Sequence, residues 1–494
     1  IGTATGYSNK AGENSIFIGA NAGYSSNVNN NMFIGTEAGY NTTLGTDNIF
    51  VGTTSGRANV IGKQNIFMGA FSGKVSTAND NVFIGPNSGY SNTTGKQNLF
   101  MGSSAGYTNV IGKQNIYVGS SAGKSSTAND NVFIGPNSGY NNTTGRQNLF
   151  MGSSSGYTNK TGLNNIYVGT ESGYNANVDN NLFMGYRSGY NTTTGAQNLF
   201  LGTNSGYTNK VGKNNIFIGS EAGYNANVDD NLFMGYRSGY NTTLGTGNIF
   251  VGSNSGYNNT VSNYNIGIGF EALNKFTSSS GASDGYNVVI GYQAGKNIGK
   301  NASTNASESY KNIIMGYQAV SDGDINQDNI VMGTQAGKLI DNTRLFTNNA
   351  IFGSYACEKA GHSSGSCVFG PNANRYGKGG VSNVIMGQKA AYIMGVNGNA
   401  TTTLKEVWSS GTYNITVDVP YGTGSYYFKD GDAIQVDSGV GSNNGEFIIS
   451  SVSSGNNGND TIINLESTST LNFPIGSSLY KKSYLDTDNI GKDD

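Results

Sequence analysis

The sequence has little charge and little proline for its length. Charged residues make up 12% of the 494 residues, and there are 5 prolines. Typical domains carry about 25% charged residues. Because the net charge is −2 and there is no basic run, we expect no nucleic-acid partner. No apolar run reaches the length of about 18 residues that a membrane-spanning helix needs, so we expect no membrane insertion.

Cysteine and histidine are also scarce. Cys357 and Cys367 occupy different positions within the repeat described below, so we expect two buried small side chains without a disulfide. The single histidine, His362, leaves little room for a Ser-His-Asp triad or a histidine-bearing zinc site. The sequence therefore predicts no enzyme and no cofactor. Occasional calcium binding is a weaker alternative to solvated turns at Asn79-Asp80, Asn129-Asp130 and Asp229-Asp230.

Glycine, in contrast, is abundant and regularly spaced. The chain has 75 glycines and repeats one motif at intervals of 16 or 17 along the sequence: Asn, three apolar residues, Gly, two variable residues, Ala or Ser, then usually Gly-Tyr. Asn31–Tyr40 is one copy. A fixed short period is typical of stacked repeats, so we expect an elongated solenoid. Because the chain begins at Ile1-Gly2, inside a repeat and without Met, we expect it to belong to a longer or processed protein. The marker glycines are Gly2, Gly19, Gly35, Gly52, Gly69, Gly85, Gly102, Gly119, Gly135, Gly152, Gly169, Gly185, Gly202, Gly219, Gly235 and Gly252.

Each apolar triplet has the composition of a short strand that is buried on both faces. Its middle residue is almost always aromatic, and stacked turns would place these rings about 4.8 Å apart. We assign the rings to the outer face, where a long aromatic stripe needs a cover. This predicts an interchain aromatic ladder in a homotrimer; a dimer or an added partner chain stays open. The ladder residues are Phe17, Phe33, Phe50, Phe67, Phe83, Phe100, Tyr117, Phe133, Phe150, Tyr167, Phe183, Phe200, Phe217, Phe233 and Phe250.

The other constant positions predict how the turns stack. Ala or Ser three residues after each marker glycine indicates a tight inward corner, and the glycine itself indicates positive φ or close backbone approach. The Asn before the triplet predicts an asparagine ladder. Parallel stacking in register would also pair Glu171 with Arg187 and Glu221 with Arg237.

The spacing also contains a longer period. Between Gly35 and Gly252 the intervals run 17, 17 and 16, which gives a 50-residue unit. We interpret this unit as a duplicated block of three turns. A three-sided coil that uses the whole unit for a single turn is the alternative.

The pattern divides the chain into three parts. Residues 1–265 form a regular solenoid shaft and residues 266–395 an irregular solenoid with insertions at Phe276–Tyr286 and Lys296–Lys311, where we expect projecting loops. Residues 396–494 lack the repeat and show alternating strands, typical of a small antiparallel barrel or sandwich.

The motif Asn-x-apolar-apolar-Gly-x-x-Ala resembles the head repeats of trimeric autotransporter adhesins. It is still more similar to the Gly/Asn-rich repeats of bacteriophage tail and side fibres, which contain short motifs such as the one at Ile290–Gly295. The resemblance covers roughly residues 1–391. It implies a parallel β-roll closed by threefold association. The aromatic middle position and the longer turns depart from the autotransporter pattern.

Together these observations predict an extracellular fibre protein on a virion surface, with other virion or surface proteins at its ends. A bacterial surface trimeric adhesin and a polysaccharide-cleaving tailspike are the alternatives. An ice-binding solenoid is disfavoured because no Thr-x-Thr rows recur on strands. Host-glycan contact is a further hypothesis, carried by the tyrosine that follows the second glycine, with Tyr90, Tyr140, Tyr190 and Tyr240 as candidates.

Overall fold

The structure of the protein is a computed structural model. Two compact units divide the chain, Ile1–Val261 and Ser262–Asp494. No helix in the described part of the chain is long and apolar enough to cross a membrane. The structure describes residues 1–276, 285–298, 309–323, 325–340, 346–359, 363–375, 380–381 and 384–389, and the backbone of six further strands between 402 and 481.

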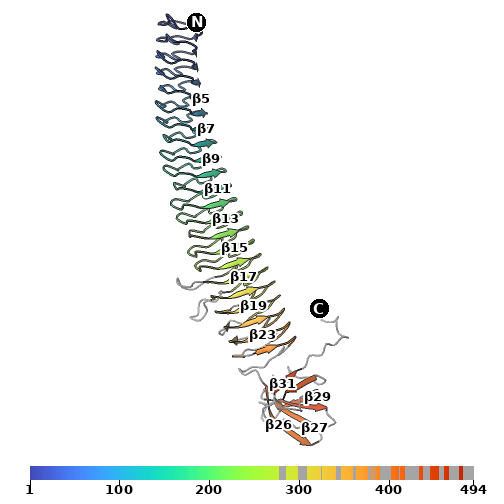
Figure 1. Cartoon of the computed structure of the whole chain (residues 1–494). Coiled ribbons are helices and arrows are strands. Elements are labelled where there is room, and N and C mark those ends of the chain that lie inside the picture. Colours follow the sequence, from blue (N-terminus) through green and yellow to red (C-terminus); the bar gives the residue numbers. More distant parts are fainter. Residues whose placement is uncertain are drawn as a thin grey trace, which may run out of the picture. The chain divides into compact units, whose positions relative to one another are not determined.

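The first unit is a parallel β-solenoid with one three-residue strand per turn (Figure 1). Asn before each triplet and Gly after it bound the strands, as the composition predicts. The strands are β1 Ile16–Ile18, β2 Met32–Ile34, β3 Ile49–Val51, β4 Ile66–Met68, β5 Val82–Ile84, β6 Leu99–Met101, β7 Ile116–Val118, β8 Val132–Ile134, β9 Leu149–Met151, β10 Ile166–Val168, β11 Leu182–Met184, β12 Leu199–Leu201, β13 Ile216–Ile218, β14 Leu232–Met234 and β15 Ile249–Val251.

Each strand pairs in register with the strand one repeat later. In β8 and β9, for example, Phe133 pairs with Phe150. One turn of the coil therefore takes a single repeat, and the alternative of a three-sided coil with one turn per larger unit is wrong. The 50-residue period marks three successive turns.

The aromatic ladder lies inside this coil and not between chains. Every ring from Phe33 to Phe250 has no exposed surface in the single chain, and Phe17 in the first strand is partly buried. Neighbouring rings stack with centroids 4.6 to 5.3 Å apart. The prediction of an interchain ladder is wrong because small corner residues leave room for a ring within each turn. The side of Phe133, for instance, contacts Gly139, where a Cβ would lie 2.5 Å from the ring.

Two ladder positions carry a tyrosine, and their hydroxyls differ in environment. Tyr117 donates to the Oγ of Ser126 at 2.7 Å. Fifty residues later Ala176 replaces that serine, and the buried hydroxyl of Tyr167 has no partner among the described residues. A buried polar group without a partner costs about 1–3 kcal/mol.

We therefore expect opposite effects from the same substitution. Tyr167→Phe should raise the free energy of unfolding by about 1 kcal/mol, whereas Tyr117→Phe should lower it by about as much. Urea unfolding of both variants measures the difference. Equal shifts of the same sign would contradict the assigned hydroxyl environments.

Asparagine ladders and glycine contacts join successive turns, as predicted. Asn65 donates from its side chain to the Oδ1 of Asn48 at 3.1 Å, and Asn48 makes the same bond to Asn31 at 3.2 Å. The marker glycines have φ between 126° and 140°. A Cβ on one of them would meet the carbonyl of the next, so both predicted roles of this glycine are confirmed.

The second unit also contains parallel solenoid turns, but its interior residues differ. The centres of its first four strands are Gly267, Val289, Ile314 and Val331, and Leu273, Phe276, Ile298 and Ile325 are also buried. Most residues of the two predicted insertions lie outside the described residues. The strands are β16 Ile266–Ile268, β17 Val288–Ile290, β18 Ile313–Met315, β19 Ile330–Met332, β21 Ala350–Phe352, β23 Cys367–Phe369 and β25 Val384–Met386, with the short β20 Phe346–Thr347, β22 Ser363–Ser364 and β24 Gly380–Val381 in a second sheet.

The backbone after the solenoid forms antiparallel strands. They close a barrel in the order β26-β27-β30-β29-β28-β31. Their bounds are β26 Thr402–Ser410, β27 Thr412–Val417, β28 Ala433–Asp437, β29 Gly445–Ser454, β30 Thr461–Glu466 and β31 Ser478–Lys481.

Candidate interaction surface

An aliphatic surface runs along the outer face of the first unit. The first and third residues of each triplet point away from the aromatic interior and are Ile, Leu, Val or Met in every strand from β1 to β15. Many remain more than a third exposed, for example Met68 at 42% and Ile166 at 41%. We call these two rows of side chains the aliphatic face.

The area of this face is close to that of a protein interface. Fifteen strands at about 4.8 Å span about 70 Å, and two side chains per strand cover a width of about 10 Å. The product, about 700 Å², approaches the ~800 Å² that each partner buries in a standard interface. It exceeds the few hundred Å² of contiguous apolar surface that soluble monomers usually expose.

Sequence reasoning predicted an apolar face in need of a cover but placed it on the wrong side of the strand. Both sides are apolar, so alternation alone does not distinguish them. The small residues at the corner of each turn indicate which side faces inward, because Gly and Ala or Ser create space on the inside for one large ring. The remaining pair of aliphatic residues then has to lie outside.

Tyrosines form a second column on the outer surface. Within three runs, separated by Arg57 with Lys74 and by Lys124, the rings lie one per turn, with centroids of neighbours 4.9 to 5.1 Å apart. Burial, followed by a nearby glutamate and then by the neighbouring tyrosines, raises the pKa of Tyr190 and of Tyr240. The column comprises Tyr7, Tyr24 and Tyr40, then Tyr90 and Tyr107, then Tyr140, Tyr157, Tyr174, Tyr190, Tyr207, Tyr224, Tyr240 and Tyr257.

Stacking covers the ring faces of the four glycan candidates. Tyr190 lies between Tyr174 and Tyr207, and Tyr240 lies between Tyr224 and Tyr257.

Tyr90 and Tyr140 are covered by a tyrosine on one side and a lysine on the other. The ammonium groups of Lys74 and Lys124 lie 5.2 Å from the two ring centroids. Since a sugar stacks on a ring face, we withdraw all four residues as stacking sites. Contact through their hydroxyls stays a prediction.

Ion pairs between turns confirm the predicted register. Arg187 lies 2.6 Å from Glu171, and Arg237 lies 2.5 Å from Glu221. The arginines are more than a third exposed, so each pair contributes little stability. Their guanidinium groups also lie 4.9 Å from the ring centroids of Tyr186 and Tyr236.

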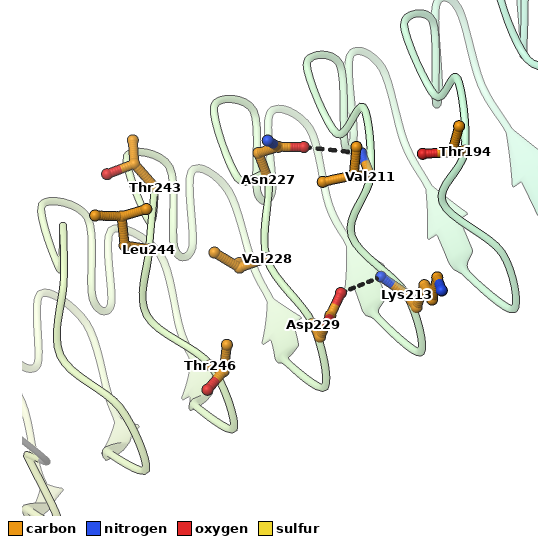
Figure 2. A pocket seen from close by; sticks show the side chains of 9 residues that line it. All are labelled: Thr194, Val211, Lys213, Asn227, Val228, Asp229, Thr243, Leu244 and Thr246. Carbon is orange, nitrogen blue, oxygen red and sulfur yellow. Dashed lines mark hydrogen bonds between the residues drawn. The ribbon is translucent and has the colours of Figure 1, made fainter.

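A shallow hollow lies at a corner of the first unit (Figure 2). Its polar groups already serve the scaffold, because Asn227 and Asp229 accept backbone N–H groups of Val211 and Lys213 at 2.9 and 2.7 Å. The lining residues are Thr194, Val211, Lys213, Asn227, Val228, Asp229, Thr243, Leu244 and Thr246.

The other side chains that could bind a metal or take part in a reaction do not cluster in the described part of the chain. That part contains no group of three or more His, Cys, Asp or Glu side chains able to hold a metal. The two cysteines are free, as predicted; burial raises the pKa of Cys357 to about 12, whereas Cys367 is only partly buried. His362 lies outside the described residues.

Among the predicted calcium turns, the Oδ1 atoms of Asn79 and Asn129 accept the backbone N–H groups of Lys63 and Lys113 at 3.0 and 2.9 Å. These oxygens therefore already have a structural role in the turns.

Comparison with known proteins finds no matching family model, curated protein or solved structure.

Proposed function

We propose that the chain is a structural fibre protein whose solenoid forms a homotrimeric shaft. The aliphatic face carries this proposal, since it is a long apolar surface with the area of an interface. A second copy of the same chain is the partner that fits it best. Identical copies aligned in parallel present the same repeat and the same apolar rows at every height.

Three copies suit the shape of the aliphatic face better than two. The face is a strip about 10 Å wide on a longer molecule. Around a threefold axis, three such strips converge and cover one another, and closure leaves no strip exposed. The mass measurement below distinguishes a dimer from a trimer.

The role of the shaft is mechanical. Asparagine ladders, in-register strands and the aromatic interior bind each turn to the next, so added repeats give length. The resemblance of the repeats to phage tail and side fibres supports placement outside the cell, on a virion surface, with other virion or surface proteins at the ends. The proposal includes no enzymatic activity, cofactor, nucleic-acid partner or membrane insertion. Host attachment would reside outside the regular shaft.

Light scattering on the purified chain tests the assembly. We expect a solution mass close to three times 51.6 kDa, which persists on dilution into the nanomolar range. A stable monomer whose aliphatic face stays exposed would contradict the proposal. A mass of twice 51.6 kDa would retain the interface and reject the threefold arrangement.

A further inference from the structure

In the second unit, large aromatic residues occur on the outer surface instead of at the strand centres. Phe270, Tyr292 and Tyr317 follow β16, β17 and β18 by two residues and are 40%, 43% and 49% exposed. The interior there is closed by Val289 and Ile314, which have no exposed surface. Packing of the core therefore does not require these three rings.

The three rings form a short column that ends abruptly. Phe270 stacks on Tyr292, and Tyr292 stacks on Tyr317, each with centroids 5.2 Å apart. In the next turn the same position is Thr334, because Met315 pairs with Met332 in register. A threonine is too short to cover a six-membered ring. One face of Tyr317 is therefore left open above Thr334.

Amide side chains lie next to this open ring face. Gln335 donates from Nε2 to the Oε1 of Gln318 at 2.8 Å, and Gln318 donates to Gln293 at 2.9 Å. Each primary amide has two N–H groups and a carbonyl with two lone pairs, so each has hydrogen-bonding capacity beyond these bonds. The row begins at Glu271, whose charge is balanced by Lys296 at 2.7 Å. The surroundings are thus polar, and Lys338, whose backbone N–H donates to the carbonyl of Gln335 at 3.3 Å, adds a cation to the same turn.

We infer that the Tyr317 face, with Thr334 and Gln335, is a binding site for a pyranose unit of a glycan. The C–H groups on one face of a sugar ring pack on an aromatic face, and its hydroxyls match amide and hydroxyl groups at the edge. The inference deepens the proposed role in host attachment, and it moves glycan contact from the covered shaft tyrosines to an uncovered ring.

The test uses the full chain on an array of neutral oligosaccharides built from glucose, galactose and N-acetylglucosamine, together with acidic oligosaccharides that contain uronic or sialic acid. We expect the parent to bind at least one of them, and Tyr317→Leu to weaken that binding by about tenfold or more. Tyr317→Phe keeps the ring face and should bind within about twofold of the parent. Tyr292→Leu is the matched control, because both faces of Tyr292 are already covered.

Absence of binding to every oligosaccharide, or equal binding by Tyr317→Leu and the parent, would overturn the inference. The solution mass of each variant separates this result from the proposed function. If Tyr317→Leu lowers the mass, Tyr317 is a subunit contact and the glycan site is rejected while the shaft stands. If the parent is monomeric and still binds through Tyr317, the glycan site stands and the trimeric shaft is rejected.

Discussion

Phe133→Asp is expected to unfold the turns around β8 and not merely to separate chains. Phe133 is fully buried between Tyr117 and Phe150, with ring centroids 4.9 Å away on both sides. A carboxylate there would have no partner and would leave the space of the ring unfilled. We expect the free energy of unfolding to fall by about 4 kcal/mol or more. A loss of this size is enough to unfold the neighbouring turns of a repeat protein.

The matched control for this variant is the next residue in the strand. Ile134→Asp places the same charge on the aliphatic face, where water can solvate it in a separated chain. We expect this variant to keep its circular dichroism spectrum while its solution mass falls towards 51.6 kDa. If Phe133→Asp melted like the parent and lost only its assembly, the interior position of the ladder would be wrong.

Gly135→Ala should be nearly as damaging, although it adds a single methyl group. Gly135 has φ of 127°, and a Cβ there would lie 2.6 Å from the carbonyl oxygen of Gly152 in the next turn. The backbone strain alone costs about 1–3 kcal/mol, and the clash cannot be relieved without separating two strands. We expect urea unfolding to show that the free energy of unfolding falls by about 3 kcal/mol or more.

An exposed position in the preceding turn supplies the comparison. Ser120 directly follows marker glycine Gly119 and is exposed, so Ser120→Ala should change the free energy of unfolding by less than about 0.5 kcal/mol. Similar stabilities for Gly135→Ala and Ser120→Ala would show that the turns are not in the close contact described above.

Much of this fold is predictable from spacing alone. The short period fixes one turn per repeat, and the constant Asn and Gly bound each strand. The charge pairs Glu171–Arg187 and Glu221–Arg237 give the register. These features depend on backbone geometry and on neighbours one repeat apart, which the sequence displays directly.

The side of the strand that faces inward was not predictable from alternation. Phe133 and Ile134 are both apolar, and the choice between them depends on the volume inside the coil. That volume is set by Gly139 and Ser138 on the opposite wall, which only the folded turn brings against the ring. Stacking of a sugar on the tyrosines Tyr90, Tyr140, Tyr190 and Tyr240 was also not predictable from alternation, because the cover of a tyrosine face depends on the turns before and after it. The end of the ring column at Tyr317 becomes clear only when the register places Thr334 at the same position in the next turn.

Site-specific disulfide crosslinking tests the central claim most directly. Cysteine is placed at Val132, Phe133 or Ile134 in a Cys367→Ser background, and the folded protein is oxidised mildly. If copies meet through the aliphatic face around a threefold axis, like residues lie at the same height near that axis. We expect Val132→Cys or Ile134→Cys to give covalent dimers and Phe133→Cys to give none. Crosslinking through Phe133→Cys, with both flanking cysteines fully reactive towards a thiol reagent, would contradict the account.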